Sequence, residues 1–417
     1  MDFSGYKSFL LSHFIEYVKI DTQSDEESTT YPSTAKQFDL LRVLEAELRE
    51  LGLSNVELDQ YGYLTATLPS NSSKKVPTVG FIAHVDTSPE ISGANVKPIV
   101  HENYQGQDIV LPDRPDTVIK FAENPWLAEQ VGNDIVTASG TTLLGADDKA
   151  GVAAIMTAMR YLLDHPEIKH GDIRVGFTPD EEVGGGTTYF DVKKFNAHCA
   201  YTLDGSTRGQ LEAETFSADA MSFRFEGFNT HPGFGKGVLI NAIKVASHFI
   251  ELLPKASLSP ETTEDRQGFV HPTNFVAGVD SAKVDFILRD FVEEKLEEEK
   301  QILLRAAQVA VDAYPGSKFT YEHRQQYRNM SVVLDKYPDV VGYARLAIEE
   351  AGLPFRTESV RGGTDGSALS FRGLPTPNIF TGEQNFHSRY EWVSVQDMLK
   401  SAEVAVRIAQ IWERNSK

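Results

Sequence analysis

Cysteine is nearly absent from this sequence, since Cys199 is the only one among 417 residues. A single thiol excludes an intrachain disulfide framework and any zinc site built from several thiolates. Cys199 stands in the stretch HCAYTLDG, which is typical of a buried strand, so we interpret it as an inert core thiol and not as a nucleophile.

Positive charge is scarce too: 40 lysines and arginines face 60 aspartates and glutamates, giving a formal net charge of −20. Nucleic acids and anionic membranes bind basic surfaces, so we expect neither as a partner. No apolar run approaches the roughly 18 residues of a membrane span. The N-terminal stretch MDFSGYKSFLLSHFIEYVKI indicates an amphipathic helix and not a signal peptide. We therefore expect a cytoplasmic protein.

Two familiar catalytic motifs are also missing. Neither H-E-x-x-H nor G-x-S-x-G occurs, which excludes the commoner zinc-protease and serine-hydrolase patterns. The stretch GFGKG at 233–237 is no phosphate-binding loop, because Lys236 is followed by Gly237 and not by serine or threonine.

The sequence does contain continuous apolar runs that alternate with helical patterns. TVGFIAHVDTS, DIRVGFTPDEEVGGG, HCAYTLDGS and TPNIFTGEQNFHS are typical of strands buried on both faces. The alternation predicts an α/β fold with a mixed sheet and helices on both faces. Segment 214–324 differs, because its predicted order is β-α-β-β-α-β. We predict an inserted ferredoxin-like domain there, with 1–213 and 325–417 forming the two parts of a larger catalytic domain.

The stretch GADDKAG at 145–151 places Asp147 and Asp148 side by side among the smallest residues. A helix start explains one aspartate as a cap, because the following GVAAIMTAMRYLLDH has helical spacing. It explains neither the second aspartate nor the glycines.

Charged residues follow each apolar run at its C-terminal end. They are His84, Asp86, Asp180, Glu181, Glu182, Asp204 and His387. Ligands of open α/β sheets bind at the carboxyl ends of the strands, so we expect these side chains on one edge, together with the GADD stretch. Each residue alone has an ordinary structural explanation, and their coincidence is what indicates a site. Histidines and carboxylates without thiolates favour a hydrolytic metal site, and we expect zinc.

Charge balance favours two ions over one. Asp147, Glu182 and Asp204 each bring a negative charge, so a single zinc ion leaves a surplus, whereas two zinc ions and one hydroxide come close to neutrality. Two metals about 3.5–4 Å apart need a bridging carboxylate, and Asp147 has small neighbours that leave room for them.

Asp86 and Glu181 are expected to support this site. His84 and Asp86 stand two residues apart, so on an extended strand they point the same way, and Asp86 can fix the tautomer of His84. Glu181 is adjacent to a predicted ligand and is free to act as a general base.

These motifs resemble those of a known family. GFIAHVDTS, TTLLGADDKAG, FTPDEEVGGG, YTLDG, THPGFGKG and RGGTDGSAL are similar to the dizinc metallopeptidases that include glutamate carboxypeptidases, aminoacylases and bacterial dipeptidases. The resemblance covers almost the whole chain and implies two zinc ions per subunit. By motif, one zinc would be held by His84 and Asp204, the other by Glu182 and His387, and both by Asp147, with a cis peptide before Asp148, Asp86 orienting His84 and Glu181 as general acid/base.

The resemblance also implies roles for the inserted domain, as a lid and as the surface of a homodimer. His231 of THPG would stabilise the developing oxyanion. Arg289 of FILRDF would take the terminal carboxylate of a peptide, for which its forked geometry is suited. Arg361, before GGTDG, is a further candidate of the same kind.

Two further stretches, DTQSDEESTTYPST and ENYQGQDIVLP, resemble family members that act on tripeptides. We therefore expect a dizinc metallo-aminopeptidase that releases the N-terminal residue of short peptides, preferably tripeptides, by hydroxide attack with Glu181 as general base. A dipeptidase or N-acyl amino-acid hydrolase on the same site is the alternative. A non-catalytic binding protein is disfavoured, because it would be expected to lack a ligand or the base, and none of these residues is missing.

Overall fold

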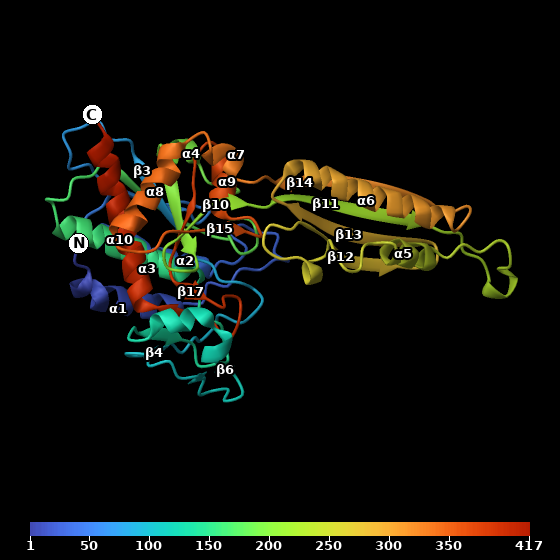
Figure 1. Ribbon diagram of the computed structural model, residues 1–417, viewed down its shortest axis with the longest axis horizontal. Coiled ribbons are helices and arrows are strands. Elements are labelled where there is room, and N and C mark those ends of the chain that lie inside the picture. The colour runs from blue at the N-terminus through green and yellow to red at the C-terminus, as the bar shows by residue number, and fades with distance from the viewer. The chain divides into compact units, whose positions relative to one another are not determined.

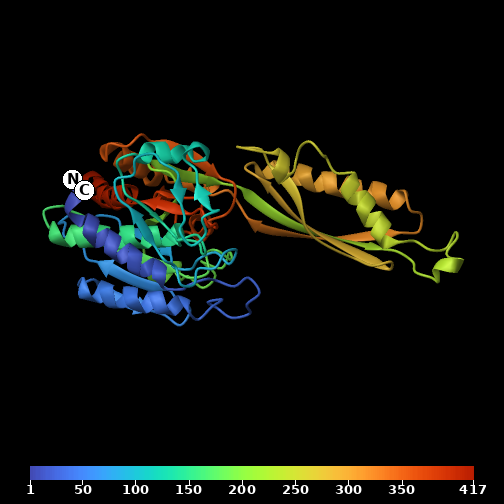
Figure 2. The same cartoon turned by 90° about the horizontal axis from the view of Figure 1, so that it is seen from below.

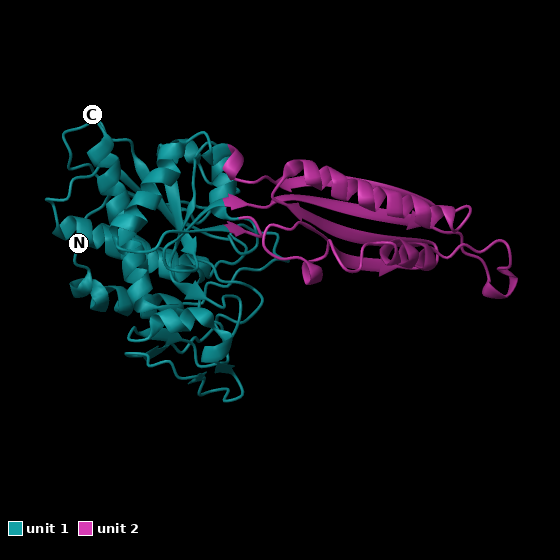
Figure 3. Cartoon of the chain, in the orientation of Figure 1, with its two compact units in different colours: residues 1–213, 333–358, 364–417 teal, residues 214–332, 359–363 magenta.

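The computed structural model describes residues 1–417, which form two compact units (Figure 3). Unit 1 consists of Met1–Ala213, Val333–Glu358 and Thr364–Lys417, and unit 2 of Glu214–Val332 and Ser359–Gly363. Unit 2 therefore extends past residue 324 and takes in a short later segment of the chain. The roles of the two parts as catalytic domain and lid stay predictions.

Unit 1 contains an eight-stranded sheet (Figure 1). In spatial order its strands are β1 (Ser54–Leu58), β2 (Leu64–Leu68), β8 (Ile173–Thr178), β3 (Val79–His84), β9 (Cys199–Gly205), β16 (Asn378–Phe380), β10 (Gln210–Thr215) and β15 (Arg356–Val360). Neighbours among β8, β3, β9 and β16 pair in parallel. Antiparallel pairs join β1 to β2, β2 to β8 and β10 to β16. The predicted mixed sheet is confirmed.

Helices cover both faces of this sheet (Figure 2). The helices of unit 1 are α1 (Lys7–Lys19), α2 (Gln37–Glu50), α3 (Ala146–Asp164), α4 (Val192–Phe195), α8 (Pro338–Glu350), α9 (Asp365–Phe371) and α10 (Val395–Asn415). The short α7 (Ser331–Leu334) spans the point where the chain passes from unit 2 to unit 1. Along β3, Phe81 and Ala83 belong to the large core that includes α3 and α10, whereas Ile82 packs in a separate cluster with Phe195 and Leu369 of α4 and α9. Since both faces are buried, the strand is apolar at successive positions.

A smaller sheet of very short strands completes unit 1. Its strand order is β17 (Glu383–Gln384), β18 (Trp392–Ser394), β7 (Ile135–Thr137) and β4 (Ile99–His101). A separate two-stranded sheet consists of β5 (Ile109–Val110) and β6 (Val118–Ile119). The 3₁₀ helices of the chain are η1 (Ser4–Tyr6), η2 (Phe121–Glu123), η3 (Pro125–Gln130), η4 (Pro232–Phe234) and η5 (Pro260–Thr262). None of the chain's helices combines the length and the apolar character that a membrane span requires.

Unit 2 contains a four-stranded antiparallel sheet with two helices. The sheet order is β12 (Phe269–Ala277), β13 (Ser281–Asp290), β11 (Ser217–Glu226) and β14 (Lys318–Tyr327), and the helices are α5 (Ala242–Glu251) and α6 (Glu293–Asp312). Both helices pack on β11 and β13, where Phe223, Phe249 and Phe286 are buried. Along the chain the order is β11-α5-β12-β13-α6-β14, so the predicted β-α-β-β-α-β arrangement is confirmed.

Glu299 is a buried carboxyl group of unit 2. Its residue is 3% exposed on α6, and neither carboxylate oxygen has a hydrogen-bond partner. Burial raises the pKa of Glu299 to about 9, and nearby Asp290 and Asp219 add to the effect. Glu299 binds its proton more tightly in the folded chain than in the unfolded chain. Its contribution to the free energy of unfolding is therefore fully present below the pKa of Glu299 in the unfolded chain and is lost as the pH rises toward 9.

We expect Glu299→Gln to remove this loss. Relative to the unaltered chain, the free energy of unfolding should increase by on the order of 2 kcal/mol at pH 8 and change little at pH 5. Urea unfolding at both pH values measures the difference, with the exposed neighbour Glu298→Gln as control. An equal shift at the two pH values would contradict this account of Glu299.

Candidate metal centre

The carboxyl ends of parallel strands bring the predicted ligands together. β3 ends at His84, which pairs with Thr178 at the end of β8, and the chain then turns into Asp180–Glu182. On the other side of β3, β9 ends with Asp204 and Gly205. β16 leads through β17 into the loop of His387. This edge of an open α/β sheet is where ligands bind.

Two groups of ligand atoms meet at this edge and share Asp147. One group is His84, Asp147 and Asp204, the other is Asp147, Glu182 and His387, and the ligand atoms of each group lie within 4.8 Å of one another. Asp147 places Oδ1 2.9 Å from Nε2 of His84 and Oδ2 3.2 Å from Nε2 of His387. Its two oxygens therefore point to different groups, as a bridging carboxylate requires.

The donor set fits two divalent cations. Oε2 of Glu182 lies 2.8 Å from Nε2 of His387, and Oδ1 of Asp204 lies 3.5 Å from Nε2 of His84. The other oxygen of Glu182, Oε1, is buried without a hydrogen-bond partner, a deficit that a cation on this carboxylate satisfies. Imidazole nitrogens and carboxylate oxygens without thiolates suit zinc and similar ions.

The charges of the two groups complement positive ions. Burial lowers the pKa of His387, but its contacts with Asp147 and Glu182 outweigh burial and raise that pKa to about 11. In His84, burial is likewise outweighed by carboxylates, which raise its pKa well above the ordinary value. Burial raises the pKa of Glu182 to about 8. The carboxylates thus stabilise positive charge at both histidines. They would stabilise bound cations at the same place by the same attraction.

Asp86 connects the two groups without belonging to either. Its buried carboxylate lies 3.3 Å from Nδ1 of His84, which leaves Nε2 of that ring facing Asp147. The same carboxylate accepts the backbone N–H groups of Glu181 at 3.0 Å and Glu182 at 3.2 Å. Asp86 therefore fixes the ring of His84 and also the backbone of both glutamates.

The turn that carries Glu181 is anchored a second time, through Asp180. Asp180 has a positive φ of 57° and accepts hydrogen bonds from the backbone N–H of Ser33, the hydroxyl of Ser33 and the side-chain amide of Gln37. Burial raises the pKa of the neighbouring Glu181 well above its ordinary value. Ser33 and Gln37 lie far from this turn in sequence, and no local pattern marks them.

The paired aspartates have different tasks in the structure. Asp148 accepts the N–H of His84 and the N–H of Gly151, both at 3.1 Å, so it caps the regular part of α3 and joins it to β3. Asp147, in a cis peptide with Asp148 as predicted, is free to face the two groups. A Cβ on Gly151 would lie 1.9 Å from the carbonyl oxygen of Leu203, so only glycine lets α3 begin this close to β9.

The three predicted substrate-binding residues belong to unit 2. His231 is exposed before η4, where its Nδ1 accepts the N–H of Gly233. Arg289, on β13, donates to the carbonyl oxygens of Asp219 and Leu288. The guanidinium of Arg289 also lies 5.3 Å from the ring centre of Tyr327.

Arg361 holds together parts of unit 2. Its guanidinium donates to the carbonyl oxygens of Asp265 at 2.8 Å and Gln267 at 2.9 Å. It also lies 5.1 Å from the ring centre of Phe216 and 5.7 Å from that of Phe269. Its substrate contact, like those of His231 and Arg289, stays a prediction from the resemblance.

Sequence reasoning missed several buried carboxyl groups near the candidate metal centre. Asp365, 7% exposed, accepts the hydroxyl of Thr178, and burial raises its pKa to about 7. Glu383 is buried on β17, and burial raises its pKa well above the ordinary value. Asp365 follows a helix-capping threonine and Glu383 lies in a two-residue strand, so neither pattern suggested a role in a site.

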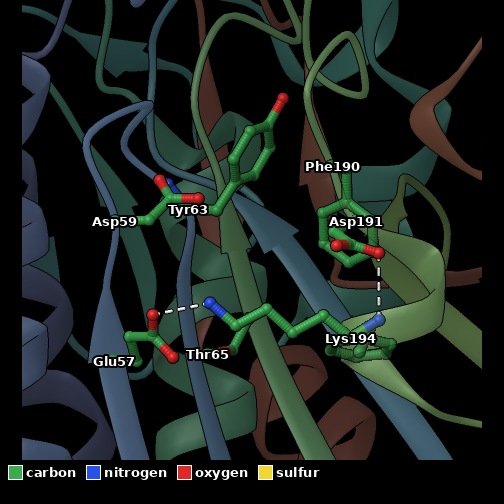
Figure 4. Close-up of a pocket in the computed structure, with 8 residues that line it drawn as sticks. Glu57, Asp59, Tyr63, Thr65, Phe190, Asp191 and Lys194 are labelled. Carbon is green, nitrogen blue, oxygen red and sulfur yellow. Dashed lines mark hydrogen bonds and ion pairs between the residues drawn. The ribbon is translucent and has the colours of Figure 1, made fainter.

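Two of the hollows in unit 1 differ in character. The one in Figure 4 is bridged by the ion pair of Lys194 with Glu57, and its lining includes none of the predicted site residues. The other adjoins the loop of His387. It is lined by Asp116, Val118, Lys120, Glu123, Asn124, Asn385, Phe386, Ser388 and Tyr390. Because Phe386 and Ser388 flank His387, this second hollow lies beside the metal centre.

An open α/β sheet whose carboxyl edge carries two ligand groups with a shared carboxylate is typical of dinuclear metallohydrolases. This chain belongs to peptidase family M20/M25/M40, whose family model matches residues 116–411. The predicted hydrolase and the predicted relationship to this metallopeptidase family are therefore confirmed. The chain is 47% identical to Peptidase T of Geobacillus thermodenitrificans (strain NG80-2) over 410 residues, covering 98% of this chain and 100% of that protein.

Other comparisons agree. Peptidase T of Clostridium botulinum (strain Kyoto / Type A2) is 48% identical over 403 residues, 97% of this chain and 98% of that one. Aminopeptidase PepT from Bacillus cereus ATCC 10987 has a similar fold, with a TM-score of 0.76, 23% identity and coverage of 97% and 98%. The Bacillus subtilis YXEP protein, a dinuclear metal binding peptidase from the M20 family, has a TM-score of 0.67, 14% identity and 99% coverage of both chains.

The shared carboxylate makes a specific prediction about metal content. Asp147→Asn should weaken the binding of both ions at least tenfold, because asparagine has one neutral oxygen where two charged ones are needed. Asp204→Asn should weaken only one of them. Metal per chain is counted by mass spectrometry after dialysis, with Asp285→Asn of unit 2 as control. Loss of a single ion in Asp147→Asn would contradict the bridging position.

Proposed function

We propose that this chain is a dizinc metallo-aminopeptidase that releases the N-terminal residue of tripeptides. The observation that carries the proposal is the pair of ligand groups joined by Asp147, with the half-buried Glu181 next in sequence to the ligand residue Glu182. The relatives named Peptidase T support peptides as the substrate class. The single cysteine and the acidic surface charge support a cytoplasmic place in peptide breakdown.

The proposed ligand assignment follows the two groups. His84 and Asp204 would hold one zinc ion, Glu182 and His387 would hold the other, and Asp147 would contact both. Bound zinc supplies a water of lowered pKa and polarises the scissile carbonyl. Asp86 keeps Nε2 of His84 turned toward the ion by occupying Nδ1.

Glu181 is proposed to move the proton. Its carboxylate takes a proton from the attacking water and then gives it to the leaving amine nitrogen, so the amide bond breaks without a free anionic amine. Burial raises the pKa of this carboxyl well above its ordinary value, which strengthens it as a base toward the water. The backbone bond from Glu181 to Asp86 keeps the side chain beside the ligands.

An asymmetric tripeptide such as Met-Gly-Phe tests the proposal. With zinc-loaded protein, mass spectrometry should find free Met and Gly-Phe. Free Phe with Met-Gly would overturn the aminopeptidase assignment. Hydrolysis of acyl amino acids or of dipeptides without cleavage of the tripeptide would instead favour the N-acyl amino-acid hydrolase or the dipeptidase.

The role of Glu181 has its own test. Glu181→Gln should lower kcat by about 10²–10⁴-fold while two zinc ions stay bound. The exposed Glu27→Gln is the control and should leave kcat unchanged. Retained turnover in Glu181→Gln, with metal content equal to that of the unaltered chain, would exclude Glu181 as the base.

A further inference from the structure

Glu391 holds the backbone on which the bridging residue stands. Glu391 stands four positions after His387, directly before β18, and is 1% exposed. The two carboxylate oxygens accept four consecutive backbone N–H groups. Oε2 accepts those of Leu144 at 2.6 Å and Gly145 at 2.9 Å, and Oε1 accepts those of Ala146 at 2.7 Å and Asp147 at 3.2 Å.

These four N–H groups need an acceptor from outside their own segment. Gly145 has a φ of 82° and Asp147 a ψ of 104°, so the segment is not helical and cannot satisfy its own donors. Buried N–H groups without partners are costly. A carboxylate has enough lone pairs on two oxygens to accept all four, whereas the amide of glutamine has one acceptor oxygen and would turn an NH₂ group toward two of the donors.

The backbone on the other side of Asp147 is anchored separately. The side chain of Asp148 accepts the N–H groups of His84 and Gly151, so the segments before and after the bridging carboxylate are both fixed. Glu391 itself belongs to neither ligand group. The loop that supplies one ligand, His387, therefore also supplies the carboxylate that holds the bridging ligand in place.

We infer that Glu391 is a positioning residue, which sets the direction of the Asp147 carboxylate and thereby the affinity of the centre for both cations. The inference rests on the proposed dinuclear centre, and it concerns metal affinity and not the chemical step. Since Asp147 belongs to both groups, loss of the hydrogen bonds to Glu391 weakens the binding of both ions together. A residue with a merely structural role would lower stability and leave the affinity of folded protein unchanged.

Zinc binding by Glu391→Gln tests the inference. We expect both apparent dissociation constants to rise about 10–100-fold in competition with a fluorescent zinc chelator, measured well below the melting temperature. The experiment is done at pH 8, because burial raises the pKa of Glu391 to about 7. Excess zinc should restore most of kcat in this variant. Glu391→Asp, which keeps the charge on a shorter side chain, should recover part of the affinity.

Glu403→Gln is the matched control, since this buried glutamate on α10 accepts its hydrogen bonds from Lys400 and Arg407 and not from residues 144–147. It should lower stability without changing zinc affinity. Unchanged affinity in Glu391→Gln would overturn the inference and leave the dinuclear centre intact. If the unaltered chain itself binds fewer than two ions, the proposed function fails first. Should Glu391→Gln not fold, Glu391→Asp decides, and affinity equal to that of the unaltered chain would overturn the inference.

Discussion

Asp147 is the residue on which the rest of the centre depends, because a single carboxylate must face two ligand groups at once. Its oxygens lie 2.9 Å from His84 and 3.2 Å from His387, side chains that come from opposite ends of the sequence. Placing it there requires close approach of α3 to β9, which Gly151 permits. It also requires a backbone segment outside the helix, whose N–H groups must find acceptors elsewhere.

Glu391 accepts those N–H groups, and other buried carboxylates outside the ligand groups hold the neighbouring segments. Asp148 joins α3 to β3, Asp86 joins His84 to the glutamate turn, and Asp180 joins that turn to Ser33. Each of them accepts at least one backbone N–H group, which offsets the cost of burying its charge. The centre is thus a set of short segments tied to one another by carboxylates, and the ligands inherit their positions from these ties.

Much of this could be predicted from sequence, for a physical reason. Long parallel strands buried on both faces are continuous apolar runs, so the polar residue that ends each one, such as His84 or Asp204, is easy to see. The adjacent aspartates were harder, and both explanations considered for them hold in the structure: Asp148 is the cap and Asp147 faces the two ligand groups. The order of elements in unit 2 was visible for the same reason, since its strands and helices are long enough to show their periods.

The rest could not be predicted because it depends on contacts between distant segments. Strands of two or three residues, such as β17 and β18 around the loop of His387, have no detectable period. Glu391 accepts backbone N–H groups 244–247 residues away, and Ser33 donates to the carboxylate of Asp180, 147 residues away. Such bonds leave no trace in local composition. Arg361 is a different case. Its place before the GGTDG motif suggested a substrate contact, whereas in the structure its guanidinium has several partners within unit 2.

The most direct test of the account is anomalous X-ray diffraction at the zinc absorption edge from crystals of the zinc-loaded protein. The account predicts two anomalous peaks about 3.5–4 Å apart, with one oxygen of Asp147 coordinated to each. A single peak, or two peaks of which only one contacts Asp147, would contradict the shared carboxylate and with it the proposed mechanism.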